Sequence, residues 1–306
     1  MLHELLITLI GISHNIRGFM SKILVIADML TQEPLAIKRA IQLANAYQST
    51  LHIVYFCNED VIGVVDHVEQ IKDDVLAKMS EKAAQQLSAI IPASETYSYE
   101  VVWASRIHKW VANYVAKEQP KLVFKTGNRS ESLFYTSTDF YLLRECQVPV
   151  LISAPEKWRK SSNILAAIDL STTKKVKQEL NTKILQQAKM LADAFNAELH
   201  VCYTVPASTL LKDLGMQYPD EMERHAQNAL DEKINAICSQ YNIEPCNFHI
   251  KAGEPGKVIT SVAAESKAGV VVIGMIGRSG ISGKVFGNTA EKTLSLLKTD
   301  VLALNP

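Results

Sequence analysis

The sequence has few cysteines and no net charge. Its cysteines are Cys57, Cys146, Cys202, Cys238 and Cys246. None forms a Cys-x-x-Cys pair or lies at metal-ligand spacing from a histidine, which argues against a zinc site and a disulfide scaffold. Lys plus Arg and Asp plus Glu both total 32, so no global field attracts nucleic acid or an anionic membrane. We expect reduced thiols in a cytoplasmic protein with neither of those partners.

Recognisable catalytic motifs are also missing. The chain has no Gly-x-Ser-x-Gly elbow, no His-Glu-x-x-His helix and no carboxylate pair at a known motif spacing. His52 and His200 lie in apolar strand patterns, which favours hydrogen-bonded core histidines over general bases. We therefore interpret the chain as a protein that binds a ligand without turnover. Weak nucleotide hydrolysis is the enzymatic alternative.

Residues 1–20 resemble neither a membrane span nor a secretory signal. Their apolar run of eight residues falls far below the roughly 20 that a bilayer requires. The first four residues include Glu4 but no lysine or arginine, and no small-residue cleavage site follows the run. Because Met20 comes just before the first strand pattern, we expect this leader to be a start-site artefact.

The rest of the chain contains one unit twice. Residues 22–28 and 163–169 are both apolar runs that end on an aspartate, and residues 43–55 match residues 191–203. The offset between matching residues is 141 at Asp28 and Asp169 and 148 at Leu51 and Leu199, so the second repeat carries seven extra residues near 171–182. Duplication predicts two domains, at 21–154 and 163–306, joined by a polar linker at 155–162.

Each repeat alternates strand-length apolar runs with helical periodicity, which predicts an α/β fold with a parallel sheet covered on both faces. In the first repeat the expected strands are 22–27, 51–56, 97–103, 121–125 and 149–153. In the second repeat they are 163–168, 198–204, 246–251, 270–274 and 300–304. The clearest expected helices are 178–196 and 221–240.

A glycine-rich segment, 274–289, follows the fourth strand of the second repeat. Ligands of parallel α/β sheets bind beyond the carboxyl ends of the strands. Glycines there let backbone N–H groups approach a phosphate, and a following helix adds its positive end. A surface loop with Asn288 as a helix N-cap is the alternative. Arg278 and Lys284 either add charge to a phosphate site or are simply solvated.

Three motifs together resemble those of the universal stress protein family. They are the aspartate that ends the first strand, Leu-His-Val on the second strand of the second repeat, and Gly-x2-Gly-x9-Gly after the fourth strand. The two-repeat length is similar to its tandem members of the E type. The resemblance implies two tandem open parallel five-stranded sheets with helices on both faces, a Rossmann-like fold of the adenine nucleotide alpha hydrolase type. It also implies ATP or a related nucleotide, accompanied by Mg²⁺, as the ligand.

The family's ligand contacts fall on the second repeat. They correspond to Asp169 and Val201 for adenine, and to Gly274, Gly277, Arg278, Gly287, Asn288 and Thr289 for ribose and phosphates. The family has Ser or Thr where this chain has Asn288, and Thr289 comes one position later. From the residues alone, Asp169 is also a candidate cap of its own turn.

The matching loop of the first repeat, 125–134, has a single glycine and begins with Lys125 where the second repeat has Gly274. Side chains there obstruct backbone approach to a phosphate, so we expect a scaffold or regulatory domain that has lost the ligand, although Asp28 remains. The function expected is a stress-response protein that binds a small ligand in its second domain and signals through protein contacts. Besides a ligand-binding protein and an enzyme, the third possible class of function is a purely structural module.

The last expected strand of each repeat is short and apolar, and an exposed strand edge must be covered. Pairing of these two strands would make the repeats an intramolecular pseudo-dimer. The sequence does not identify the partner proteins or the stress that induces the chain.

Overall fold

The computed structural model describes residues 21–27, 35–57, 68–126, 137–154, 162–275, 278–280, 283–285, 293–294 and 296–306. The predicted leader 1–20, Asp28 and all but the last residue of the linker 155–162 lie outside the described residues. The chain forms two compact units, Met1–Thr126 and Gly127–Pro306.

The first unit is a parallel sheet in the order β3-β2-β1-β4. Its strands are β1 (Lys22–Ala27), β2 (Thr50–Cys57), β3 (Tyr97–Trp103) and β4 (Leu122–Thr126). Its helices are α1 (Leu35–Tyr47), α2 (Val68–Ile90) and α3 (Ile107–Glu118). Helix α1 packs against β1 and β2, and α2 packs against β3. The central strand β1 buries Ile23, Leu24 and Val25 completely, which explains its unbroken apolar run.

The second unit repeats this order and adds two strands, β12 and β5. Its strands are β5 (Val150–Ser153), β6 (Asn163–Ile168), β7 (Leu199–Pro206), β8 (Phe248–Gly253), β9 (Ala268–Gly274) and β12 (Asp300–Leu304). The parallel order is β12-β9-β6-β7-β8, and β5 pairs antiparallel with β12. Because β5 pairs with β12, the boundary between the compact units comes before the linker that the repeat predicts.

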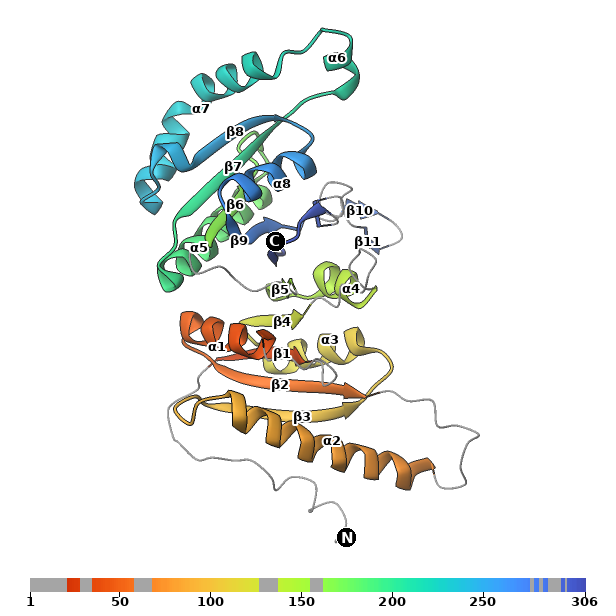
Figure 1. The fold of residues 1–306 in the computed structure, drawn as a ribbon. Helices are drawn as coiled ribbons and strands as arrows, with labels where there is room; N and C mark the ends of the chain where they lie inside the picture. The colour runs from red at the N-terminus through yellow and green to blue at the C-terminus, as the bar shows by residue number, and fades with distance from the viewer. Residues whose placement is uncertain are drawn as a thin grey trace. The chain divides into compact units, whose positions relative to one another are not determined.

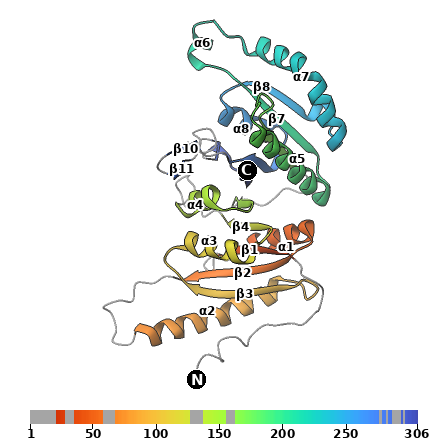
Figure 2. The same ribbon diagram turned by 180° about the vertical axis from the view of Figure 1, so that it is seen from behind.

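Helices cover both faces of this second sheet (Figures 1 and 2). The helices of this unit are α4 (Ser137–Glu145), α5 (Lys175–Phe195), α6 (Thr209–Asp213), α7 (Pro219–Tyr241) and α8 (Pro255–Glu265), with a 3₁₀ turn at Pro245–Asn247. Helices α5 and α7 contact each other on one face, and α8 packs on β7, β8 and β9 from the other. The α/β fold with open parallel sheets is therefore as predicted.

The seven extra residues of the second repeat are accounted for by a longer helix. Helix α5 has 21 residues and α1 has 13. Seven residues correspond to about two helical turns. These turns bring Lys177 and Asn181 beside the loop that follows β6, where the sequence places the ligand.

Within the described ranges, none of the helices combines the length and apolar character needed to cross a bilayer.

Candidate functional site

Asp169 and Gly274 lie at the same edge of the second sheet. Asp169 follows the last residue of β6, and Gly274 is the last residue of β9. The two strands are parallel neighbours, with Ala166 opposite Val272. This is the carboxyl edge, where parallel α/β folds bind ligands. The structure therefore brings together two of the residues that the sequence predicted to act together.

The Asp169 carboxylate is held by three donors. Its Oδ1 accepts from the Ser171 backbone N–H at 3.2 Å and from the Ser171 hydroxyl at 2.7 Å. Its Oδ2 accepts from Lys177 Nζ at 3.1 Å. Burial raises the pKa of this carboxyl, but the hydrogen bonds from Ser171 and Lys177 outweigh burial and hold the pKa below its usual value. Asp169 is thus ionised at neutral pH and caps its own turn.

The Asp169 side chain also remains accessible, with 40% of its surface exposed, and that of Lys177 is 36% exposed. A carboxylate oxygen can accept more than one hydrogen bond, so Oδ2 retains acceptor capacity beside the Lys177 ammonium group. The turn-capping and ligand-binding interpretations of Asp169 are therefore compatible. The local charge arrangement is one anion paired with one cation at the sheet edge.

The backbone of this loop is fixed by Asn181 of α5. Asn181 Oδ1 accepts from the Asp169 N–H at 3.1 Å, and Asn181 Nδ2 donates to the Asp169 carbonyl at 2.8 Å. Lys233 of α7 donates to the next carbonyl, that of Leu170, at 3.0 Å. Two helices therefore hold the loop in one conformation.

Replacing Asn181 with alanine is expected to lower the free energy of unfolding by about 1–2 kcal/mol, because two half-buried backbone groups lose their partner. Urea denaturation measures this loss. Thr182→Ala is the matched control, since Thr182 is exposed and bonds only within its own helix, to the Gln178 carbonyl. Equal losses in the two variants would contradict a role of Asn181 in fixing the loop.

Gly274 lacks a side chain because α5 fills the space. A Cβ at this position would lie 2.6 Å from Leu180 Cδ2 and 3.2 Å from Ile184 Cδ1. Its φ is not in the left-handed region, so backbone conformation does not require glycine here. Close packing of α5 onto β9 therefore explains Gly274, a reason that sequence reasoning about phosphate approach missed.

Val201 lies deeper than the predicted site. It pairs with Ala166 of β6 and Phe248 of β8, and its side chain is 0% exposed. Its assignment to the ligand site stays a prediction that follows from the resemblance.

The glycine-rich segment is only partly described. Gly277, Gly287, Asn288 and Thr289 lie outside the described residues, as do the side chains of Arg278 and Lys284. The backbone of Arg278 begins β10 (Arg278–Gly280), which pairs antiparallel with β11 (Gly283–Val285). Sequence reasoning treated this stretch as a loop. A spacing of two residues between Gly280 and Gly283 is typical of a β-hairpin. Strands of only three residues are too short to show an alternating hydrophobic pattern in the sequence.

The sequence aligns Lys125 of the first repeat with Gly274, but the strand register places the next residue, Thr126, there. Lys125 pairs with Ile26 of β1 and is 8% exposed. Ala166 pairs with Val272, so Gly274 lies level with Ile168, and the counterpart of Ile168 in the first repeat is Ala27 rather than Ile26. The alignment of Lys125 with Gly274 is therefore off by one residue. The rest of that loop, 127–134, lies outside the described residues.

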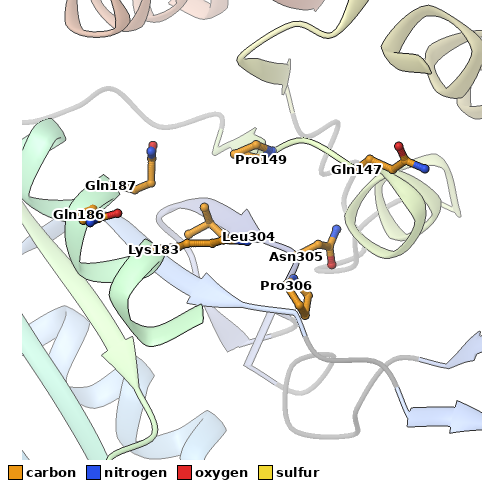
Figure 3. A pocket seen from close by; sticks show the side chains of 8 residues that line it. All are labelled: Gln147, Pro149, Lys183, Gln186, Gln187, Leu304, Asn305 and Pro306. Atoms are coloured by element: carbon orange, nitrogen blue, oxygen red, sulfur yellow. The ribbon is translucent and has the colours of Figure 1, made fainter. Parts of the chain in front are cut away.

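A small pocket opens beside the carboxyl end of β12. Its volume is about 230 Å³ (Figure 3). It is lined by Gln147, Pro149, Lys183, Gln186, Gln187, Leu304, Asn305 and Pro306. Leu304 pairs with Gly274, so the pocket lies at the same sheet edge as the predicted site, on its β12 side. No group of three or more His, Cys, Asp or Glu among the described residues could hold a metal ion.

Comparison with known proteins agrees with this architecture. The sequence profile of the Universal stress protein family matches residues 20–153 and 161–305. Universal stress protein E of Escherichia coli K12 is 26% identical over 296 residues, which cover 92% of this chain and 93% of that protein. A universal stress protein E homolog of Haemophilus influenzae is 24% identical and covers 93% of this chain and 97% of its own.

A solved structure points to the same family. The crystal structure of a putative universal stress protein from Pseudomonas aeruginosa has a TM-score of 0.69 and 28% identity, covering 94% of each chain. The two profile matches lie on the two sequence repeats and together span most of the chain. The chain belongs to the universal stress protein family, with two of its domains in tandem.

Proposed function

We propose that this chain binds a nucleotide or a nucleotide-containing metabolite at the carboxyl edge of its second sheet and acts in the stress response through contacts with other proteins. The observation that carries the proposal is the ionised, half-exposed Asp169 beside Gly274, at the ends of neighbouring parallel strands. The proposal includes a cytoplasmic location, domains at 21–154 and 163–306, and no turnover of the ligand.

The chemistry of these residues fits such a ligand. Asp169 is an acceptor for the amino or ring N–H groups of a base, and Lys177 adds a donor beside it. The segment that follows Gly274 would supply N–H groups for phosphates, with Mg²⁺ balancing their charge when a nucleotide is bound. The first repeat, whose loop after β4 has a single glycine, would serve as scaffold or regulator.

A second candidate, a structural module without a ligand, is favoured by a specific observation. Internal donors already occupy the Asp169 carboxylate, and Leu180 fills the space beside Gly274. Both features hold without any guest molecule. Weak ATP hydrolysis is the enzymatic alternative, and release of ADP by the purified protein above background would support it.

The proposal also includes an intramolecular pseudo-dimer of the two repeats. Its support is the antiparallel pairing of β5, the last strand of the first repeat, with β12, the last strand of the second. Two copies of one strand that meet edge to edge around a twofold axis run antiparallel. The register places Leu302 opposite Leu151, near the middle of both strands.

Native mass spectrometry of gently purified protein tests the binding proposal. The chain is expected to retain the mass of a nucleotide-type ligand. Asp169→Ala is expected to weaken retention by about tenfold, the effect of losing one hydrogen bond to a charged group. Asp28→Ala, the matched change in the first repeat, is expected to leave retention unchanged. No added mass in the unmodified protein would favour the structural module, and loss with Asp28→Ala would move the ligand to the first repeat.

A further inference from the structure

The pocket of about 230 Å³ beside β12 is built by both sequence repeats. Gln147 and Pro149 come from the end of the first repeat, and the other lining residues come from α5, from the end of β12 and from the two residues after it. Figure 3 shows these side chains around the pocket. Because β5 pairs with β12, the pocket lies where the two repeats meet within the second unit. A molecule bound there would contact both repeats.

The size and the walls of the pocket suit a small polar molecule rather than a nucleotide. Its volume equals that of about eight water molecules at liquid density, whereas pockets for drug-sized ligands usually exceed about 300 Å³. None of its lining residues is among those predicted to contact a nucleotide. A carboxamide both donates and accepts hydrogen bonds. Four lining residues carry one: Gln147, Gln186, Gln187 and Asn305.

Lys183 gives the pocket a cation. It lies on α5 and is exposed, so its ammonium group is at the rim of the pocket. Within the part of the chain that the structure describes, Lys183 pairs with no carboxylate, neither with a side chain nor with the main-chain carboxylate of Pro306. Glu179, one turn earlier on α5, pairs with Lys175 instead. The Lys183 ammonium group is therefore available to an anion that enters the pocket.

The antiparallel pairing of β5 with β12 indicates which kind of anion fits. The register is symmetric about the central leucine of each strand, so a local twofold axis passes between these two leucines. The axis relates Asp300 to Pro149, because Val-Leu follows both residues, and it relates Ala154 to Asn305. The two ends of the strand pair can therefore be compared residue by residue.

A carboxylate takes part in the pairing at one end only. There, Asp300 Oδ1 accepts from the Ala154 N–H at 2.7 Å. At the other end Pro149 replaces the aspartate, and its ring has no acceptor. Among the described residues, the Asn305 N–H donates to no acceptor. Both Pro149 and Asn305 line the pocket, which therefore lies where the twofold-related end has a carboxylate.

From this geometry we infer that the pocket binds a small organic acid. Its carboxylate takes the place that the Asp300 carboxylate has at the other end, where one oxygen accepts from the Asn305 N–H and the other meets Lys183. The carboxamides of Gln147 and Gln186 bond a polar tail, such as an amide or a hydroxyl group. Because the acid contacts both repeats, its binding stabilises the pairing of β5 with β12. This site does not depend on the proposed nucleotide site.

Titration of the ¹⁵N-labelled full chain with N-acetylglycine, a small carboxylate with an amide tail, tests the site at neutral pH and constant ionic strength. The Asn305 N–H resonance is expected to move downfield and to saturate, with a dissociation constant of about 1 mM because so small a ligand makes few contacts. N-acetylglycinamide, which has an amide in place of the carboxylate, is expected to bind at least about tenfold more weakly. Equal binding of the two compounds, or no saturation below about 50 mM, would overturn the inference.

Two variants test the groups that hold the carboxylate. Lys183→Gln removes the cation but keeps a polar side chain, so N-acetylglycine is expected to bind about tenfold more weakly. Lys175→Gln, which removes an exposed lysine of the same helix outside the pocket, is expected to leave binding unchanged. Pro149→Asp provides a carboxylate of the chain itself beside the Asn305 N–H and is expected to abolish binding. Equal binding by the two lysine variants would refute the site.

Hydrogen exchange tests the contact with both repeats. N-acetylglycine at about ten times its dissociation constant is expected to slow exchange in β5 by about tenfold, because separation of β5 from β12 opens the pocket. Exchange in β8, at the far edge of the second sheet, is expected to stay constant. Asp169→Ala is expected to retain this effect, so the acid site and the nucleotide site can fail separately. Inorganic phosphate that binds as tightly as N-acetylglycine would contradict a site for carboxylates.

Discussion

Replacing Gly274 with valine is expected to lower the free energy of unfolding by about 3 kcal/mol, even without any ligand. The valine Cβ would lie 2.6 Å from Leu180 Cδ2 and 3.0 Å from Leu180 Cγ. Leu180 is 3% exposed and Ile184 is 2% exposed, so neither side chain can move into solvent. Helix α5 would have to shift away from β9. Chemical denaturation of the purified chain measures the loss.

A second substitution tests the cause. Leu180→Ala removes the atoms that the new side chain would meet, so the double variant is expected to be more stable than the sum of the two single losses predicts. A coupling energy of about 1 kcal/mol or more would establish packing as the reason for glycine. If Gly274→Val leaves stability unchanged and affects only ligand retention, the glycine serves the ligand alone.

The strands were predictable because both sheets bury their central strands on two sides. The apolar runs expected at 22–27 and 163–168 coincide with β1 and β6, and the expected 97–103 coincides with β3. Duplication gave each expected strand of one repeat a counterpart in the other. Helix ends were less predictable: 178–196 was expected where α5 spans Lys175–Phe195. The final turn of a helix depends on local capping rather than on periodicity.

The candidate site was only half predictable. Asp169 and Gly274 were found because an aspartate after a strand and a glycine at a strand end are local signals. The partners of Asp169 were not predicted, because Lys177 and Asn181 reach it only through the longer helix α5. Two partners of His200, Asn163 and His249, lie 37 and 49 residues away in the chain. Such contacts depend on strand register, which local patterns leave open.

Asp300 holds the pairing of β5 with β12 through one buried hydrogen bond. Its Oδ1 accepts from the Ala154 N–H at 2.7 Å, and the two residues are 1% and 3% exposed. Asp300→Ala is expected to lower the free energy of unfolding by about 3 kcal/mol, because a buried N–H loses its acceptor. Hydrogen exchange in β5 should rise more than in β7, which lies three strands from β12 in the parallel order.

Two controls test the hydrogen bond. Asp300→Asn keeps an oxygen that can accept from the Ala154 N–H and is expected to cost about half as much. Asp213→Ala removes an exposed carboxylate elsewhere in the second unit and is expected to change stability by less than about 0.5 kcal/mol. Equal effects of Asp300→Ala and Asp213→Ala would show that β5 is held by its backbone ladder alone.

The same contact limits the symmetry of the proposed pseudo-dimer. Val-Leu follows Asp300 in β12, and Val-Leu also follows Pro149 at the start of β5, so these two residues correspond. Proline has no side-chain acceptor, and therefore the twofold-related bond at the other end of the strand pair cannot form. The other end of the strand pair has a different tie, from Asn305 Nδ2 to the Cys146 carbonyl at 2.6 Å. We expect exchange in Asp300→Ala to spread from Ala154 along β5, because that end loses the hydrogen bond to Asp300.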